Sequence, residues 1–191
     1  MSKSNKRDDI LQAALELVAE NGFHGAPMAM IADRAGVGAG TIYRYFADKD
    51  ALMIAVYGVL EVKISELLAH GYSVEAPIRE RFLHLGENLL RYLIDNPLEF
   101  SYLEQFHNSP YGTDYRRDKI FVNRDENNFF LALFEDGIAQ NVIKDFPLPV
   151  LFDLAFGPTI AVARDHILGF VDVGNGLIEE IIEACWDGIR K

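Results

Sequence analysis

The sequence predicts an all-α protein of about nine helices, with a small N-terminal helix-turn-helix domain (residues 1–50) and a larger helical domain (residues 51–191). Apolar residues recur at the three-to-four-residue spacing of a buried helix face along most of the chain, and no stretch alternates convincingly as a strand would. Half of the 191 residues are hydrophobic, which suffices for a packed core. Breaks that contain glycine or proline divide the pattern into separate helices.

The first helix is predicted from Lys6 to Asn21, because its apolar residues fall on one face and Gly22 can end it in a left-handed conformation. A second helix starts at Pro27, whose restricted φ suits a first helical position. After a third, short helix, Asp48 is the expected N-cap of a helix that continues towards His70.

Five further helices are expected beyond the break at residues 71–77. They run up to Asn96, from Pro97 to Asn108, from Thr113 to about Ala139, from about Pro149 to Phe170, and from Leu177 to Arg190. Proline starts or precedes three of them, and the Thr113–Ala139 segment is read as one long helix.

Residues 28–49 are typical of a helix-turn-helix. Gly36 stands where a short helix must stop and turn, because glycine enters the left-handed conformation without a Cβ clash. Ala32 is small enough for the short helix after the turn to cross closely, and Ile31 and Ile42 can pack between the two helices. The helix after the turn, held in this way, can enter the major groove of DNA. The alternative is a helical hairpin inside some other all-α domain.

The first third of the chain carries five motifs of defined residue type and spacing. They are Ile10-Leu11-x-Ala13-Ala14, Glu20-Asn21-Gly22-Phe23, Ile31-Ala32-x-x-Ala35-Gly36-Val37, Gly40-Thr41-Ile42-Tyr43-Arg44-Tyr45-Phe46 and Asp48-Lys49-Asp50-x-Leu52. Together they resemble the DNA-binding domain of the tetracycline-repressor (TetR) family. The resemblance implies a homodimeric transcriptional regulator, with a repressor favoured over an activator. It also implies a C-terminal domain that binds a small molecule and alters the spacing of two DNA-reading domains on an inverted-repeat operator.

Eight residues are the candidates for contact with DNA. They are Lys6, Pro27, Ala39, Thr41, Tyr43, Arg44, Tyr45 and Lys49. Thr41, Tyr43 and Arg44 are expected to carry the sequence preference, because their side chains can reach base edges or phosphates. Lys49 and a basic arm of Lys3, Lys6 and Arg7 are expected to contribute mainly affinity, although the arm could equally be a solvated tail. For Tyr45, a phosphate contact and a partly buried place under the turn are equally open.

Two positions depart from the family pattern. Ala26-Pro27 stands where the family usually has hydroxyl residues, which puts in doubt an N-cap of about 1 kcal/mol and a phosphate contact. The backbone N–H groups that follow can still bind a phosphate. Gly38-Ala39 replaces a common polar pair, so Ala39 can offer only an apolar contact to a thymine methyl group.

The charge distribution removes an apparent objection to DNA binding. The net charge of −11 is unusual for a nucleic-acid-binding protein. Residues 1–50, however, carry six Lys/Arg and seven acidic residues, whereas residues 51–191 carry twelve and twenty-two. The acidity therefore belongs mainly to the second domain.

Catalytic, metal and cofactor sites are not expected. The five histidines occur singly, without the spacing of metal ligands. Cys185, the only cysteine, is expected to be a buried apolar side chain in a protein of the reducing cytoplasm. No apolar run reaches the length of about 18 residues that a membrane span needs, and no signal peptide is expected. An all-α small-molecule carrier or enzyme that does not bind DNA is the alternative function.

The last two helices are expected to form a dimer interface. Each has apolar residues on two faces, so each needs a second partner besides its own core. The candidate residues are Ile160, Ala163, Ile167, Leu177, Ile181 and Cys185. Two such helices from each subunit can form an isologous four-helix bundle. Both faces could instead be internal core, and which face meets the partner is open.

An apolar effector pocket is expected in the second domain, because fifteen of the twenty-two aromatic residues lie between Phe82 and Phe170. The candidate lining residues are Phe100, Leu103, Phe106, His107, Arg124, Asn127, Phe134, Phe152, Phe156 and Thr159. Polar groups on an apolar face need partners, and a small lipophilic effector with one or two polar groups would supply them. A solid aromatic core is the competing interpretation.

Overall fold

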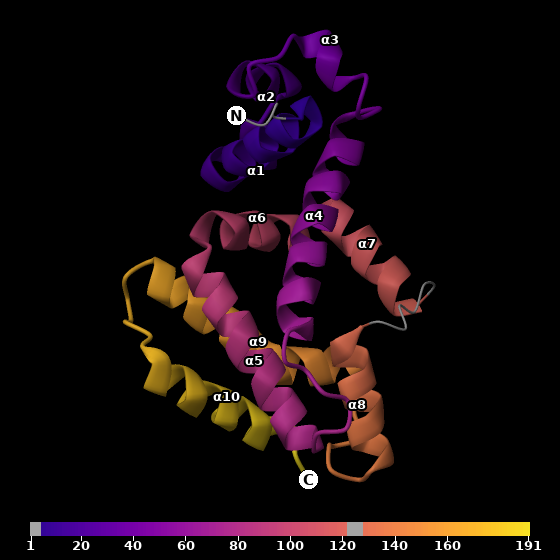
Figure 1. The fold of residues 1–191 in the computed structure, drawn as a ribbon, viewed down its shortest axis with the longest axis vertical. Helices are drawn as coiled ribbons and strands as arrows, with labels where there is room; N and C mark the ends of the chain where they lie inside the picture. Colours follow the sequence, from indigo (N-terminus) through magenta and orange to yellow (C-terminus); the bar gives the residue numbers. More distant parts are fainter. Residues whose placement is uncertain (1–4, 122–127) are drawn as a thin grey trace. The chain divides into compact units, whose positions relative to one another are not determined.

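The computed structural model describes residues 5–121 and 128–191, which form ten helices (Figure 1). Their bounds are α1 Lys6–Gly25, α2 Met28–Arg34, α3 Ala39–Ile42, α4 Lys49–Ala69, α5 Ile78–Asp95, α6 Pro97–His107, α7 Pro110–Phe121, α8 Phe129–Ala139, α9 Leu148–Ile167 and α10 Asn175–Ile189. Within the described ranges, the only β-type pairing is an isolated bridge between Ile143 and Arg190. The predicted all-α fold is confirmed.

The helices pack into two compact units. Unit 1 comprises Met1–Lys63 and Pro97–Asn123, and unit 2 comprises Ile64–Asn96 and Arg124–Lys191. α6 and α7 therefore pack with the N-terminal helices, while α4 contributes residues to both units. The functional division at residue 50 stays a prediction, because compactness describes packing and not activity.

Unit 1 is built on α1, whose apolar face is fully buried. Ile10, Ala14 and Leu17 on this face are at most 1% exposed, in agreement with the predicted periodicity. Its regular run is interrupted at Gly22, which has a φ of +74° that residues with a Cβ rarely adopt. Gly22 thus breaks the helix where the sequence predicted its end.

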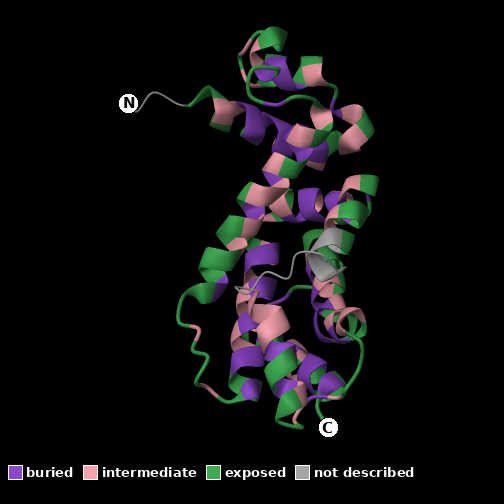
Figure 2. Cartoon of the chain, turned by 90° about the vertical axis from the view of Figure 1, so that its right-hand side faces the viewer, coloured by how far each residue is buried: buried purple, intermediate pink, exposed green. Residues whose placement is uncertain are grey.

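Unit 2 is built on α5, α9 and α10, which lie side by side (Figure 1). Buried and exposed residues alternate around these helices, as expected for amphipathic helices that share a core (Figure 2). Phe82 of α5 lies at its centre, with its ring centroid 5.4 Å from those of both Phe156 and Trp186. The aromatic side chains therefore form much of the core of unit 2.

The prediction of one long helix from Thr113 to about Ala139 is wrong. α7 is described over Pro110–Phe121, and the backbone at Asn128 is extended, so α8 begins as a separate helix at Phe129. The Asn128 side-chain oxygen accepts hydrogen bonds from the backbone N–H groups of Phe130 and Leu131, each at 3.1 Å. Asparagine is a strong N-cap because it supplies an acceptor to N–H groups that no helical carbonyl can reach, and here this capping starts a new helix.

No helix in the described part of the chain is both long enough and apolar enough to cross a membrane.

Close packing of α5 on α10 generates a first prediction. A Cβ built on Gly86 lies 2.7 Å from Cγ2 of the buried Ile182, so Gly86→Ala should force these helices apart and lower the free energy of unfolding by about 1–3 kcal/mol. Gly58→Ala in α4 is the matched control, because its Cβ meets nothing within 4 Å and a helical alanine should stabilise by about 0.5–1 kcal/mol. Chemical denaturation of both variants measures the difference. Equal stabilisation by the two substitutions would contradict the close contact.

Candidate nucleic-acid interface and effector-binding residues

The helix-turn-helix is formed by α2, a tight turn and α3. Gly36 has a φ of +64° and the Val37 N–H donates to the Ala32 carbonyl at 3.0 Å, which closes the turn as a helix C-cap. Ile31 and Ile42 are fully buried beneath it. The predicted roles of the turn glycine and of the two isoleucines are thus seen in the structure.

The second helix of the motif, α3, is short. Only Ala39–Ile42 is helical, and Tyr43, Arg44 and Tyr45 follow in a tighter turn. The Arg44 and Tyr45 N–H groups donate to carbonyls three residues back, at 3.2 and 2.9 Å, a bonding pattern that narrows the helix at its end. These three side chains therefore project from a turn and not from the helix itself.

Most of the candidate DNA-contacting residues are accessible at this turn. Ala39 and Arg44 are exposed, Tyr43 is 56% exposed and Tyr45 is 44% exposed, whereas Thr41 is half-buried. Two exposed tyrosine rings beside an arginine suit contact with sugar, phosphate or base edges. The structure brings these residues together on one short segment.

At the start of α2, Pro27 is exposed and provides no side-chain cap. The hydroxyl cap that the sequence lacked is therefore not replaced by another side chain at this position. The backbone N–H groups of the first turn of α2 are the polar groups that remain for a phosphate.

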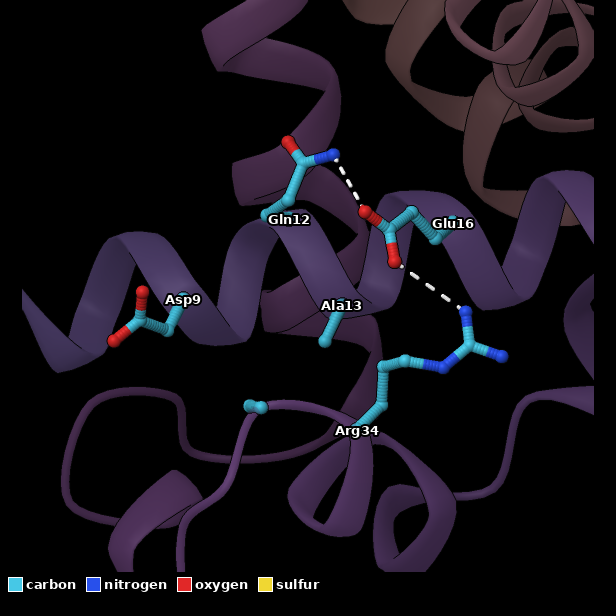
Figure 3. A pocket seen from close by; sticks show the side chains of 6 residues that line it. Asp9, Gln12, Ala13, Glu16 and Arg34 are labelled. Carbon is cyan, nitrogen blue, oxygen red and sulfur yellow. Dashed lines mark hydrogen bonds and ion pairs between the residues drawn. The ribbon is translucent and has the colours of Figure 1, made fainter. Parts of the chain in front are cut away.

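Arg34 connects the first two helices of unit 1 through hydrogen bonds and ion pairs. Arg34 of α2 forms hydrogen bonds of 3.0–3.3 Å with Glu16 and Glu20 of α1, and Figure 3 shows Glu16 between Gln12 and Arg34. The hydrogen bonds from Arg34 to Glu20 lower the pKa of the Glu20 carboxyl. They fix α2 on α1 and leave the Arg34 charge neutralised within the unit.

The N-terminal arm is described from residue 5 onward. Lys6 is exposed, while the guanidinium of Arg7 lies 5.6 Å from the ring centroid of Phe46 in a cation–π arrangement. Arg7 thus connects the start of α1 to the segment after α3. The side chain of Lys6 is exposed to solvent.

Lys49 has a structural partner that the sequence did not reveal. Its ammonium donates to the Phe23 carbonyl, just after the break in α1. Burial lowers the pKa of Lys49, and the neighbouring Asp50 partly opposes this. Asp48 is the N-cap of α4 as predicted, since its carboxylate accepts from the Ala51 N–H at 2.8 Å.

Side chains of α6 bind the backbone of α1 and α4, and sequence analysis missed them. Gln105 donates to the Val18 carbonyl at 2.7 Å and Ser101 to the Ala19 carbonyl at 3.1 Å. The fully buried Tyr102 donates from its hydroxyl to the Met53 carbonyl at 2.7 Å. No short-range signal could identify these bonds, because the partners are about 50 to 90 residues apart in the chain.

Four of the predicted pocket residues belong to α6 and pack within unit 1. Phe100, Leu103 and Phe106 are buried and His107 is exposed. The Phe106 ring stacks on Tyr57 of α4 at 4.2 Å between centroids. Phe106 is thus part of an aromatic contact between α4 and α6.

Four other predicted pocket residues belong to unit 2. Phe134, Phe156 and Thr159 are buried and Phe152 is half-buried, with the Phe152 and Phe156 ring centroids 5.3 Å apart. Arg124 and Asn127 lie outside the described residues.

Thr159 carries a buried hydroxyl that has no hydrogen-bond partner in the described part of the chain. Burial raises the pKa of the Cys185 thiol, and the Thr159 side chain partly opposes this rise. Cys185 is buried, as predicted.

Arg81 is a buried charge in unit 2 that sequence analysis overlooked. Its side chain is 2% exposed and its Nη1 donates to Oδ2 of Asp136 at 2.7 Å. The Nε donates to the Tyr72 hydroxyl at 2.9 Å. The sequence did contain a signal for this burial. Arg81 lies three residues after Ile78 and four before Leu85, on the apolar face of α5.

The predicted dimer-interface residues differ in accessibility. Ala163 and Cys185 are buried inside unit 2, Ile160 and Ile181 are half-buried, and Ile167 and Leu177 are exposed. The exposed apolar stripe along α9 consists of Val150, Leu154, Pro158, Ala161 and Leu168. The stripe through Phe156, Thr159 and Ala163 forms internal core instead.

Among the residues described here, no group of three or more His, Cys, Asp and Glu side chains is arranged to hold a metal ion.

Comparison with known proteins covers nearly the whole chain. A family model described as bacterial regulatory proteins of the tetR family matches residues 10–56, and one described as the tetracyclin repressor-like C-terminal domain matches residues 77–190. The solved structure of a TetR-family protein from Vibrio parahaemolyticus is 33% identical, with a TM-score of 0.78 over 98% of this chain and 100% of that chain.

Two further matches carry names related to lipid metabolism. The fatty acid metabolism regulator protein of Bacillus subtilis is 27% identical over 179 residues, which are 89% of this chain and 81% of that protein. The solved structure of FadR from Bacillus subtilis in complex with stearoyl-CoA has a TM-score of 0.76 at 19% identity, over 95% of this chain and 98% of that chain. At this identity, the second match concerns the fold alone.

The hydrogen bond of Lys49 generates a second prediction. Lys49→Met removes the donor to the Phe23 carbonyl and should lower the free energy of unfolding by about 1 kcal/mol. Lys6→Met is the matched control, since an exposed cation should change stability by less than about 0.5 kcal/mol. Thermal or urea denaturation distinguishes the two. Identical midpoints for both variants would show that the Lys49 bond contributes nothing.

Proposed function

The chain belongs to the TetR family of DNA-binding transcriptional regulators, and we propose that it acts as a homodimeric repressor that a small lipophilic effector releases from its operator. Residues 1–50 form the proposed DNA-binding domain, and residues 51–191 form the proposed effector-binding and dimerisation domain. The proposal assigns no catalytic step to the chain.

The observation that carries the DNA-binding proposal is the exposed turn around Arg44, held over buried Ile31 and Ile42. In the proposed complex this segment enters a major groove, and Thr41, Tyr43 and Arg44 read base edges. Exposed Ala39 meets a thymine methyl group.

Affinity comes from contacts to the DNA backbone. Lys6, Tyr45 and the first turn of α2 after Pro27 face phosphates in the proposed complex. Lys49 is also proposed to contact a phosphate. To reach one, its ammonium must break or share its hydrogen bond to the Phe23 carbonyl.

Dimerisation is supported by the exposed apolar stripe of α9. The stripe is continuous with exposed Ile167 and with Phe170, which is 77% exposed just beyond the helix. Isologous pairing of α9 and α10 would cover it, together with Leu177 and Ile181 of α10. The small side chains of Pro158 and Ala161 would allow close approach of two helices.

Effector binding is assigned to the aromatic interior of unit 2, around Phe134, Phe152, Phe156 and Thr159. The buried hydroxyl of Thr159, which has no hydrogen-bond partner among the described residues, offers a polar contact inside an apolar region. The relative named for fatty acid metabolism and the fold neighbour bound to stearoyl-CoA favour a fatty-acyl compound as the effector class.

DNA reading by Arg44 is tested by selecting duplexes from a random pool and measuring affinities for the recovered inverted repeat. Arg44→Ala should lower specific affinity by about 10-fold or more, or change the preferred base at one position of each half-site, because a lost base contact costs about 1–3 kcal/mol.

The control is Lys6→Met, which removes a positive charge that is proposed to face the DNA backbone. It should weaken all duplexes about equally and reduce the slope of log affinity against log salt by about one for each contact removed. An Arg44→Ala protein with the affinity and preference of the unchanged protein would refute the assignment.

The proposed interface is tested by sedimentation without DNA. The unchanged protein should be a dimer at micromolar concentration, and Leu154→Glu should give a monomer, because two charges would be buried across the symmetry axis. Val74→Glu, at a position that is 64% exposed in the segment before α5, should leave the dimer intact. A monomeric unchanged protein, or a dimer of unaltered strength for Leu154→Glu, would exclude this interface.

A further inference from the structure

Unit 2 contains a buried guanidinium whose hydrogen-bonding capacity is only partly used. In the residues that the structure describes, two buried side-chain polar atoms lack a partner, Nη2 of Arg81 and Oγ1 of Thr159, and both belong to unit 2. Arg81 is the more demanding of the two, because it carries a charge and its side chain is 2% exposed.

The donors of Arg81 can be followed one by one. A guanidinium has five N–H groups in one plane. The Nε donates to the Tyr72 hydroxyl at 2.9 Å, and Nη1 donates to a single oxygen of Asp136 at 2.7 Å. Both N–H groups of Nη2 are without an acceptor among residues 5–121 and 128–191. Nη2 shares an edge of the guanidinium with each of the other two nitrogens, so it can take part in a two-bond contact to an oxyanion.

The surroundings hold the guanidinium in place and leave its counter-ion accessible. Its Cζ lies 5.6 Å from the centroid of the Tyr72 ring, which in turn packs edge-on against Phe129 of α8 at 5.0 Å. Asp136 of α8 is 50% exposed, in contrast to its buried partner. The positive charge is therefore fixed between α5 and α8 and is matched by a carboxylate that faces water.

The same two helices contribute to the aromatic cluster of unit 2. Phe82 follows Arg81 directly in α5, and Phe130 and Phe134 precede Asp136 in α8. Phe82, Phe130 and Phe134 all pack against Phe156, with ring centroids 4.7–6.2 Å away. A buried cation and an apolar aromatic cluster on the same pair of helices match a ligand that has an anionic end and an apolar body.

We propose that Arg81 binds the oxyanion of the effector, a carboxylate or phosphate attached to a lipophilic group, by donation from Nη2. Tyr72 holds the guanidinium in orientation, and Asp136 neutralises it until the anion binds and then shares it. This inference rests on the proposed function, because it assigns a charge to the effector of the proposed regulator. A neutral lipophilic effector would leave Nη2 without an acceptor.

The test uses three probes with the same alkyl chain: sodium decanoate, decanoyl-CoA and 1-decanol. Binding to the full-length protein is measured by calorimetry, and release of the selected duplex is measured by gel retardation. The unchanged protein should bind decanoate or decanoyl-CoA at least ten-fold more tightly than decanol. A response to decanoate alone indicates recognition of a carboxylate, a response to decanoyl-CoA alone indicates recognition of its phosphates, and a response to both shows that Nη2 accepts either oxyanion.

Three variants separate recognition from structure. Arg81→Gln should abolish the preference for the anions and retain decanol binding. Asp136→Asn removes a competing carboxylate from an exposed position, so it should tighten binding of the anion several-fold. Arg79→Gln, two residues away on α5 and paired at the surface with Glu183, is the matched control and should change neither. If Arg81→Gln fails to fold, the Asp136→Asn result decides.

The outcomes are distinguishable from failure of the proposed function. Equal binding of all three probes by the unchanged protein would overturn the role of Arg81, as would weaker or unchanged anion binding by Asp136→Asn. Retardation of the duplex without binding of any probe would also overturn it while leaving the DNA-binding proposal intact. A protein that retards no duplex from the random pool would refute the proposed function itself.

Discussion

The arrangement of unit 1 depends on how the backbone carbonyls at the end of α1 obtain hydrogen-bond donors. The last four carbonyls of a helix have no partners within it, and the regular part of α1 stops at Gly22. Gln105 and Ser101 of α6 donate to carbonyls at this end of α1, and Lys49 of α4 donates to the Phe23 carbonyl just after the break. α1 also holds α2 through Arg34, so the exposed turn that follows α3 is positioned by donors from distant segments.

Local sequence signals predicted the N-terminal motif well because each of its features is short-range. Gly36 and Asp48 act through their own conformation or their own side-chain acceptor, and both behave as the sequence indicated. The division of the Thr113–Ala139 segment was missed because helical periodicity continues across it, while a single capping side chain at Asn128 determines where α8 begins. The bonds of Gln105 could not be foreseen, since no local rule names an acceptor 87 residues away.

The two apolar stripes of α9 illustrate a second limit of sequence patterns. Thr159 and Ala163 on one stripe and Leu154 and Ala161 on the other follow equally good helical spacing, so periodicity alone cannot separate core from surface. Burial separates them, because α5 and α10 cover only one side of α9 within unit 2. Of the six predicted interface residues, Ala163 and Cys185 are buried in the core of unit 2, and Ile167 and Leu177 are exposed. The exposed stripe is the part of the helix that still has apolar surface to bury.

The stability of unit 2 does not by itself explain why a charged residue is buried at position 81. Its neighbours on the buried face of α5 are Ile78 and Phe82, and a leucine at position 81 would fill that face without desolvating a charge. Replacing a buried ion pair with well-packed apolar residues is often neutral or stabilises by about 1–4 kcal/mol, so the pair with Asp136 is weak evidence of a structural purpose. Burial opposes the charge, yet the hydrogen bonds to Asp136 and Tyr72 keep the pKa of Arg81 above its ordinary value. Unit 2 thus maintains a permanent cation beside the Tyr72 ring, and its Nη2 has no acceptor in the described part of the chain. Such a group is costly for a core and useful for recognising an anion.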